Sequence, residues 1–243
     1  MRHPLLEVAT PSLTSAYAAE AGGAARVELC TALEVGGLTP SHAVIAIACE
    51  RLRIPIHVLI RPRAGDFVFD DLECEVMQRD IEACKALGCA GIVLGALDPD
   101  GNVDVTCCRD LVSAAQGMSV TFHRAFDFAR KPYQALEAIV ALGCDRLLTS
   151  GQCADALEGA PLIRELIEQA RGRIIVMAGD GITPQNIAAI AHATGTCELH
   201  CAAKARVPGG MRDTPSGLGE MDAGRWETDA AIVRRCVDAL GEV

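Results

Sequence analysis

The chain alternates between short apolar runs and longer stretches with helical periodicity along nearly its whole length. The apolar runs lack the strict alternation of a half-exposed strand, which is typical of parallel strands covered by helices. The runs lie at 5–9, 26–30, 54–61, 91–97, 119–124, 146–150, 173–178 and 197–202, and helical stretches include 41–51, 72–87, 132–142 and 184–193. Eight such runs, alternating with helical stretches, predict an α/β fold, a (β/α)8 TIM-like barrel with a parallel sheet.

The length of 243 residues suits one barrel of about 250 residues, so we expect residues 1–243 to form a single domain. Residues 205–227 are rich in Gly and Pro and have no hydrophobic period, which predicts a long loop over the mouth of the barrel. A last helix at about 228–240 is expected to close the ring. Because half of the residues are hydrophobic but only 3% are aromatic, small and aliphatic side chains are expected to fill the interior.

Two short motifs indicate where helices begin and end. Thr-Pro occurs at 10–11, 39–40 and 183–184, where the Thr is expected to cap a helix and the Pro to fit its first turn. Ala-Leu-Gly-Cys occurs at 86–89 and 141–144, where the Gly is expected to end a helix in the left-handed conformation.

Charge and cysteine usage limit the class of protein. The net charge of −10 argues against a nucleic-acid partner, because phosphate binding favours a basic surface. No run approaches the ~18 apolar residues of a membrane span, and the first residues lack a signal-peptide pattern, so we expect no membrane association. The twelve cysteines include no C-x-x-C pair, which predicts reduced, mostly buried thiols and a cytoplasmic location.

Polar residues gather toward the carboxyl ends of the apolar runs, and in a parallel barrel these ends meet at one mouth. Strand alternation and the cost of unpaired burial predict that the following side chains face inward there: Glu7, Glu28, Cys30, Arg61, Arg63, His123, Glu198 and His200. Carboxyl and imidazole groups exchange protons, so the catalytic candidates are Glu28, His123, Glu198 and His200, with His123 expected to titrate near neutrality. The same charges could instead form a buried ion network that fixes strand register.

Several groups at the mouth are candidates for binding a small anion, a phosphate or a carboxylate. Arg61 and Arg63 flank a rigid proline, and guanidinium groups bind such anions through paired hydrogen bonds. Arg124 ends another run, and the turn with Gly179 and Gly181 precedes an expected helix start, where backbone N–H groups bind anions. Asp180 in that turn would oppose an anion if it pointed inward, and the glycines could serve only a tight turn.

Thiols at the mouth also allow a metal site. Cys30 and Cys201, together with His123 and His200, could supply thiolate and imidazole ligands for Cu(I) or Zn(II). Cys201 has the wrong parity to face the interior, and no short ligand spacing supports a preformed site. The residues leave the metal open between Cu(I) and Zn(II), with Cys30 and Cys201 as the hypothetical thiolate ligands, and we expect no organic cofactor.

Several motifs together resemble those of the CutC copper homeostasis family. They are RVELC at 26–30, GGLTPS at 36–41, IRPR at 60–63, GDF at 65–67, TFHRAFD at 121–127, LTSG at 148–151 and ELH at 198–200. The resemblance runs from about residue 5 to 212 and implies a TIM-like barrel, a cytoplasmic location, self-association into a homo-oligomer and Cu(I) binding, with Cys30 at the family's Val-Glu-Leu-Cys cysteine. On the basis of this resemblance we expect a copper homeostasis protein, and the alternative is a barrel enzyme acting on a small anionic metabolite through the Glu/Arg/His site.

Overall fold

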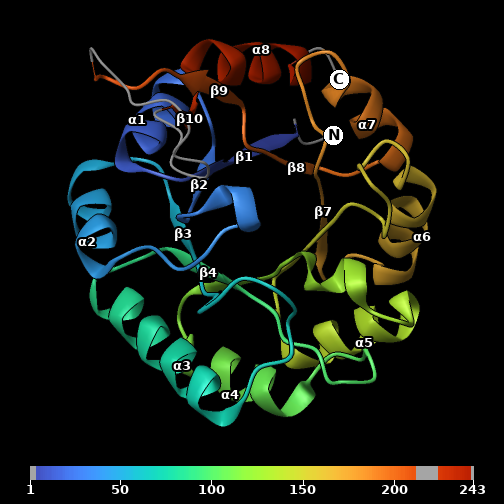
Figure 1. The fold of residues 1–243 in the computed structure, drawn as a ribbon. Helices are drawn as coiled ribbons and strands as arrows, with labels where there is room; N and C mark the ends of the chain where they lie inside the picture. Colours follow the sequence, from blue (N-terminus) through green and yellow to red (C-terminus); the bar gives the residue numbers. More distant parts are fainter. Residues whose placement is uncertain (1–3, 212–223, 242–243) are drawn as a thin grey trace, which may run out of the picture.

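The eight predicted runs form one closed parallel barrel in a computed structural model that describes residues 4–211 and 224–241, so the predicted fold is confirmed. The strands pair in sequence order, and β1 closes the ring against β8. Helices surround them on the outside (Figure 1). The strands are β1 (Leu5–Thr10), β2 (Arg26–Leu29), β3 (Ile56–Leu59), β4 (Gly91–Leu94), β5 (Ser119–Phe122), β6 (Arg146–Thr149), β7 (Ile175–Gly179) and β8 (Glu198–Cys201).

The outer ring consists of α-helices that follow the strands, with two short 3-10 helices in the loops. The helices are α1 (Leu13–Gly22), α2 (His42–Arg51), α3 (Asp71–Ala86), α4 (Val105–Ala114), α5 (Pro132–Leu142), α6 (Ala160–Ala170), α7 (Ile187–Thr194) and α8 (Ala230–Leu240), with η1 (Leu33–Val35) and η2 (Arg124–Phe128). Within the described ranges, none of these helices has the length and apolar character needed to cross a membrane.

The Thr-Pro motifs precede helices but do not cap them, so that prediction is wrong in detail. Ser12 and Ser41 are the N-caps of α1 and α2, and each accepts a hydrogen bond from the first turn. Thr10 instead ends β1 and donates to the carbonyl of Glu28. The glycine prediction holds, because Gly143 caps α5 with a φ of 85°. The second such glycine, in the Ala-Leu-Gly-Cys motif after α3, has a φ of 80°.

The two faces of the barrel strands differ in chemistry. The outward face belongs to a large apolar core under the helices and includes residues such as Val27, Leu29 and Leu94. The inward positions of the same strands carry buried charged or polar side chains, which are Glu7, Arg26, Glu28, His57, Thr121, Arg146, Glu198 and His200. The barrel interior is therefore mixed, because aliphatic side chains such as Leu59 and Val93 lie there beside the charged groups, and the expectation of an aliphatic interior holds only in part. The larger apolar cluster lies between the strands and the helices.

Part of the segment that the sequence predicts as a loop, at 205–227, forms strands. Its ends form an antiparallel ribbon of β9 (Lys204–Val207) and β10 (Arg225–Thr228), while residues 212–223 lie outside the described residues. Glu227 accepts hydrogen bonds from the hydroxyl groups of Ser12 and Ser15. The ribbon is thus attached to the first turn of α1, next to α8 (Figure 1).

Candidate active site at the carboxyl end of the barrel

A cavity of about 780 Å³ opens at the carboxyl ends of the strands, and we call it the mouth cavity. Of the predicted site residues, those that line it are Glu28, Arg61, His123, Arg124, Gly181, His200 and Cys201. Arg63, Gly179, Glu198 and Cys30 do not line it. Lys204, Trp226 and Arg235, which have no role in the sequence-based prediction, are among the other residues that line it. Part of the predicted set therefore shares one cavity at the mouth of the barrel, together with residues that the sequence did not indicate.

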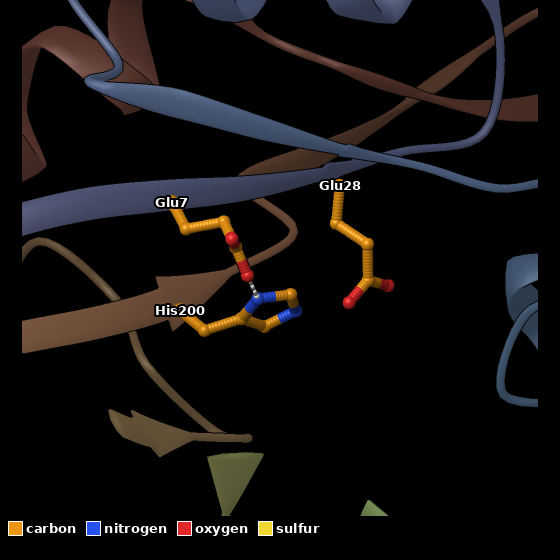
Figure 2. Close-up of side chains that lie close together, drawn as sticks. All are labelled: Glu7, Glu28 and His200. Carbon is orange, nitrogen blue, oxygen red and sulfur yellow. Dashed lines mark hydrogen bonds and ion pairs between the residues drawn. The ribbon is translucent and has the colours of Figure 1, made fainter. Parts of the chain in front are cut away.

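His200 lies between two carboxylates inside the barrel. Its Nδ1 is 2.8 Å from Oε1 of Glu7, and the ring turns its other edge toward the side of Glu28 (Figure 2). Burial alone would lower the pKa of His200, but the charge of Glu28 and the hydrogen bond to Glu7 outweigh it and raise this pKa. Glu7 is also buried, yet its bonds to His200 and Arg26 hold its pKa below the ordinary value. Glu7 is therefore ionised, and His200 keeps its proton more readily than a free imidazole.

Glu28 is the least satisfied carboxyl group of the site. It is only 6% exposed, and its Oε2 has no hydrogen-bond partner among the described residues. Burial raises its pKa to about 7, aided by the charge of Glu7 and opposed by that of His200. A carboxyl group in this state gains and loses a proton near neutral pH, which suits a general acid or base.

His123 is held in one tautomer by the backbone. It directly follows β5 and caps η2, where its Nδ1 accepts a hydrogen bond of 3.1 Å from the N–H of Ala125. The proton of the neutral ring must then lie on Nε2, which is buried and has no partner in the described structure. Burial and the charge of Arg61 lower the pKa of His123 to about 3. The expectation that it titrates near neutrality is wrong, and His123 is a neutral ring near pH 7 whose Nε2–H has no partner among the described residues.

Arg61 is a buried cation beside His123. Its terminal nitrogens donate to the backbone carbonyls of Val35, Gly37 and Gly65. No carboxylate within the described ranges pairs with it, and its buried Nε has no partner. The Phe67 ring connects the two residues, with its centroid 4.8 Å from the Arg61 guanidinium and 5.1 Å from the His123 ring centroid. Arg61 thus keeps a positive charge and an unused N–H at the cavity.

Arg63 does not accompany Arg61 into the mouth, and this part of the inward prediction is wrong. Its guanidinium pairs with Glu73 of α3 and with Asp66. The reason is that β3 ends at Leu59, so strand alternation no longer fixes side-chain direction at position 63.

The predicted anion cradle after β7 is already filled by a side chain of the protein. Asp180 pairs with Arg124 and accepts a 2.8 Å hydrogen bond from the N–H of Gly181. Arg124 is also bound by Asp127 at 2.8 Å. Any side chain at Gly179 would collide with Leu148, whose Cδ1 lies 2.5 Å from the position of a Cβ. The glycines therefore serve a close approach and a turn, and Arg124 is neutralised from within.

Glu198 belongs to a layer deeper in the barrel. It is the first residue of β8, and its Oε2 lies 2.7 Å from Nη2 of Arg26 and 2.7 Å from Nε of Arg146. Its placement at the mouth is therefore wrong. Glu198 instead belongs to a buried ion network, which the sequence left open as an alternative. Its members form a continuous chain of ion pairs, Glu7, Arg26, Glu198 and Arg146.

The two predicted copper ligands do not share a site. Cys30 packs against Leu59 and Val93 on the inner side, and burial raises its pKa. Cys201 belongs to the outer apolar core and hydrogen-bonds to Cys236 of α8. In the part of the chain that the structure describes, one group of three possible ligands has its donor atoms within 4.8 Å of one another, Glu7, Glu28 and His200. Two carboxylates and an imidazole suit a divalent cation better than Cu(I), and the positive Arg26 beside Glu7 opposes any cation.

Comparison with known proteins agrees with this fold. The family model of the CutC family matches residues 4–205. A family protein CutC from Xanthomonas axonopodis pv. citri is 51% identical over 235 residues, 97% of this chain and 98% of that protein. A mouse protein named copper homeostasis protein cutC homolog is 48% identical over 208 residues, 86% of this chain and 76% of that protein. A crystal structure of CutC from Streptococcus agalactiae has a TM-score of 0.79 at 36% identity, covering 82% of this chain and 98% of that chain. The chain belongs to the CutC family.

Proposed function

We propose that this protein is an enzyme that transfers a proton on a small anionic metabolite. The observation that carries the proposal is a set of three buried polar atoms without partners in the described structure, Glu28 Oε2, Arg61 Nε and His123 Nε2. All three belong to residues that line the mouth cavity, and we call these the floor residues. Buried polar atoms normally have a partner, so three such atoms at one cavity indicate groups kept ready for a ligand.

The floor residues have complementary roles in such a reaction. Glu28, with a pKa of about 7, removes a proton from the substrate and returns it. The Nε2–H of neutral His123 and the cation of Arg61 stabilise negative charge that develops on a substrate oxygen, for example the oxygen of a carbonyl group. His200, held by Glu7, supplies a second proton close to Glu28. The pKa of Glu28 is raised and the pKa of His123 is lowered. One small site can therefore hold a carboxyl group that exchanges protons near neutral pH beside a neutral imidazole that donates a hydrogen bond.

Exchange of substrate protons with deuterated solvent tests the proposal without knowledge of the product. Small phosphorylated and carboxylated aldehydes and ketones are incubated with the protein in D2O, and loss of the proton next to the carbonyl is followed by NMR. We expect exchange for at least one compound, and Glu28→Gln should slow it by about 10²- to 10⁴-fold.

Two controls separate catalysis from folding. Glu75→Gln removes an exposed carboxylate on α3 and should leave exchange unchanged. Melting temperatures of both variants should equal or exceed that of the wild type. If no compound exchanges, or if Glu28→Gln exchanges as fast as wild type, the proposed reaction is wrong.

Direct Cu(I) binding is a second candidate function, favoured by a thiol pair elsewhere in the fold. The mouse relative is named for copper homeostasis. In this chain Cys74 of α3 and Cys107 of α4 place their sulfur atoms 2.7 Å apart without a disulfide. Burial raises the pKa of both thiols, so copper binding would have to displace their protons and move the sulfur atoms apart around the ion. Two neighbouring thiols that become thiolates in this way suit Cu(I), which prefers soft ligands. We therefore transfer the proposed copper ligands from Cys30 and Cys201 to Cys74 and Cys107.

Competition against a Cu(I) chelator tests this second function. Reduced wild-type protein should compete for Cu(I), Cys74→Ser should lose most of that affinity, and Cys30→Ser should keep it. If wild type and Cys74→Ser compete equally for Cu(I), the Cys74–Cys107 pair is not the copper site. If Cys30→Ser loses Cu(I) affinity, Cys30 is a copper ligand.

The proposed cytoplasmic location is supported by the cysteines, because all twelve are free thiols. Self-association into a homo-oligomer stays a prediction, and light scattering would measure the molar mass in solution.

A further inference from the structure

The cations that line the mouth cavity differ in how their charge is compensated. Arg124 is paired with two carboxylates, and Arg61 donates to backbone carbonyls. Lys204 and Arg235 contact no carboxylate among the residues at 4–211 and 224–241. We infer that Lys204 and Arg235 bind a phosphoryl group of the substrate, which rests on the proposed function and names its substrate class.

Both residues lie where this architecture commonly binds phosphate. Lys204 begins β9 directly after β8, and Arg235 lies on α8, which is adjacent to the ribbon in Figure 1. Residues 181–185 after β7 also line the cavity. Barrel enzymes frequently bind phosphate with the loops that follow strands seven and eight. Two uncompensated cations here are notable because the whole chain carries a net charge of −10.

Trp226 completes this side of the cavity, and we call Lys204, Trp226 and Arg235 the rim residues. The Nζ of Lys204 lies over the Trp226 ring, 5.3 Å from its centroid. This cation–π contact holds the ammonium group at the ring face. The ribbon that carries both residues is fixed to α1 through Glu227. The rim cation is therefore placed by a structured element, even though Trp226 itself is 45% exposed.

The floor and the rim together describe a ligand with two polar ends. The floor residues are 4 to 6% exposed, whereas Lys204 and Arg235 are exposed to solvent. A volume of about 780 Å³ accommodates a small metabolite, since ligand cavities commonly measure about 300–1,000 Å³. A carbonyl end at the floor and a phosphoryl end at the rim would satisfy Arg61, His123 and both rim cations at once. The substrate class is thus a small phosphorylated carbonyl compound.

Titration with inorganic phosphate tests the rim directly, because Trp226 is the only tryptophan of the chain and reports binding by its emission. The titration uses about pH 8, where phosphate is mainly a dianion, and chloride holds the ionic strength constant. Wild type should show saturable binding. Lys204→Gln and Arg235→Gln should each raise the Kd about tenfold, as expected for loss of one charged hydrogen bond.

Three controls decide what a change means. Arg109→Gln removes an exposed arginine on α4, across the barrel from α8 (Figure 1), and should leave the Kd unchanged. Arg61→Lys should affect phosphate binding less than either rim variant. Glu28→Gln should still bind phosphate even where proton exchange is lost, so the rim and the proposed reaction can fail separately.

Several outcomes would overturn the inference. They are no phosphate binding by wild type, an equal loss of affinity in Arg109→Gln, or a loss in Arg61→Lys alone, which would move the anion to the floor. If acetate binds as tightly as phosphate, the rim residues bind a carboxylate group of the substrate and the inferred phosphoryl group is wrong. Calorimetry provides a second readout for any variant whose tryptophan emission is altered before ligand is added.

Discussion

Replacement of Glu28 by Gln should stabilise the protein above neutral pH while it slows proton transfer. The folded protein raises the pKa of Glu28 from 4.5 to about 7, mainly because the carboxyl group is buried. Below its unfolded pKa the group is neutral in both states and has no effect on the free energy of unfolding. As the pH rises toward 7, the unfolded chain releases the proton before the folded protein does, so the wild type loses stability. Gln has nearly the same shape, cannot ionise and avoids this loss.

The size of the effect follows from the displacement of the pKa. A change of one unit in the pKa of a group corresponds to about 1.4 kcal/mol in the free energy of unfolding. Above the folded pKa of Glu28, its ionisation therefore lowers the stability of the wild type by about 3 kcal/mol. The attraction between ionised Glu28 and protonated His200 disappears in the variant, which reduces the gain. We therefore expect Glu28→Gln to be more stable than wild type by about 1–3 kcal/mol at about pH 8, and by about 1 kcal/mol or less at about pH 5.

Chemical denaturation of both proteins at the two pH values measures this difference. Glu7→Gln provides a control of opposite sign, because Glu7 is paired with Arg26 and His200, and its pKa is lowered by the hydrogen bond to His200 and the charge of Arg26 despite burial. Its stabilising effect is present above the unfolded pKa and is lost as the pH falls through the folded pKa, so this variant should be less stable at about pH 8. A Glu28→Gln protein that is less stable than wild type at the higher pH would show that the Glu28 carboxylate has a stabilising partner, and would refute the reasoning.

Three further predictions concern the mouth cavity and the ion network inside the barrel. His123→Asn keeps an acceptor for the N–H of Ala125 but removes the Nε2–H, so turnover should fall about 10²- to 10⁴-fold at an unchanged melting temperature; wild-type turnover would exclude a donor role. The pH profile of kcat/KM should rise through about pH 7, because Glu28 must be ionised to act as a base, and a profile that is flat there would assign the base elsewhere. Glu198→Gln leaves Arg26 and Arg146 partly uncompensated, so denaturation should show a loss of about 3–5 kcal/mol, and a neutral result would mean that the ion network adds nothing to stability.

The barrel was predictable from the sequence because covered parallel strands form recognisable apolar runs. Alternation within a run also identified Glu28 and His200 as inward-facing residues. Alternation sets the face of a side chain but not its height in the barrel, and this is why Glu198 was placed at the mouth. It also has no meaning beyond the end of a strand, which explains the error at Arg63.

Other features of the site depend on contacts that the sequence does not indicate. The low pKa of His123 comes from its burial and from Arg61, which approaches through a loop. The rim depends on pairing between β9 and β10, two short segments separated by residues with no hydrophobic period. The Cys74–Cys107 contact requires a particular packing of α3 on α4, and cysteine spacing carries no signal for it. Long-range packing therefore decides which of the plausible groups become functional.

The ion network inside the barrel has a consequence for the order in which the chain folds. Glu7 finds its imidazole partner 193 residues later, and Arg26 finds Glu198 172 residues later. Both early charges therefore stay without these partners until β8 has been synthesised. A nascent chain that lacks β8 can form its helices and the Glu7–Arg26 ion pair between the first two strands, but it would bury that pair without the second partner that each residue has in the folded protein. Ring closure is thus a late, all-or-none step, and a chain truncated before residue 198 should populate an open, protease-sensitive intermediate rather than a smaller barrel.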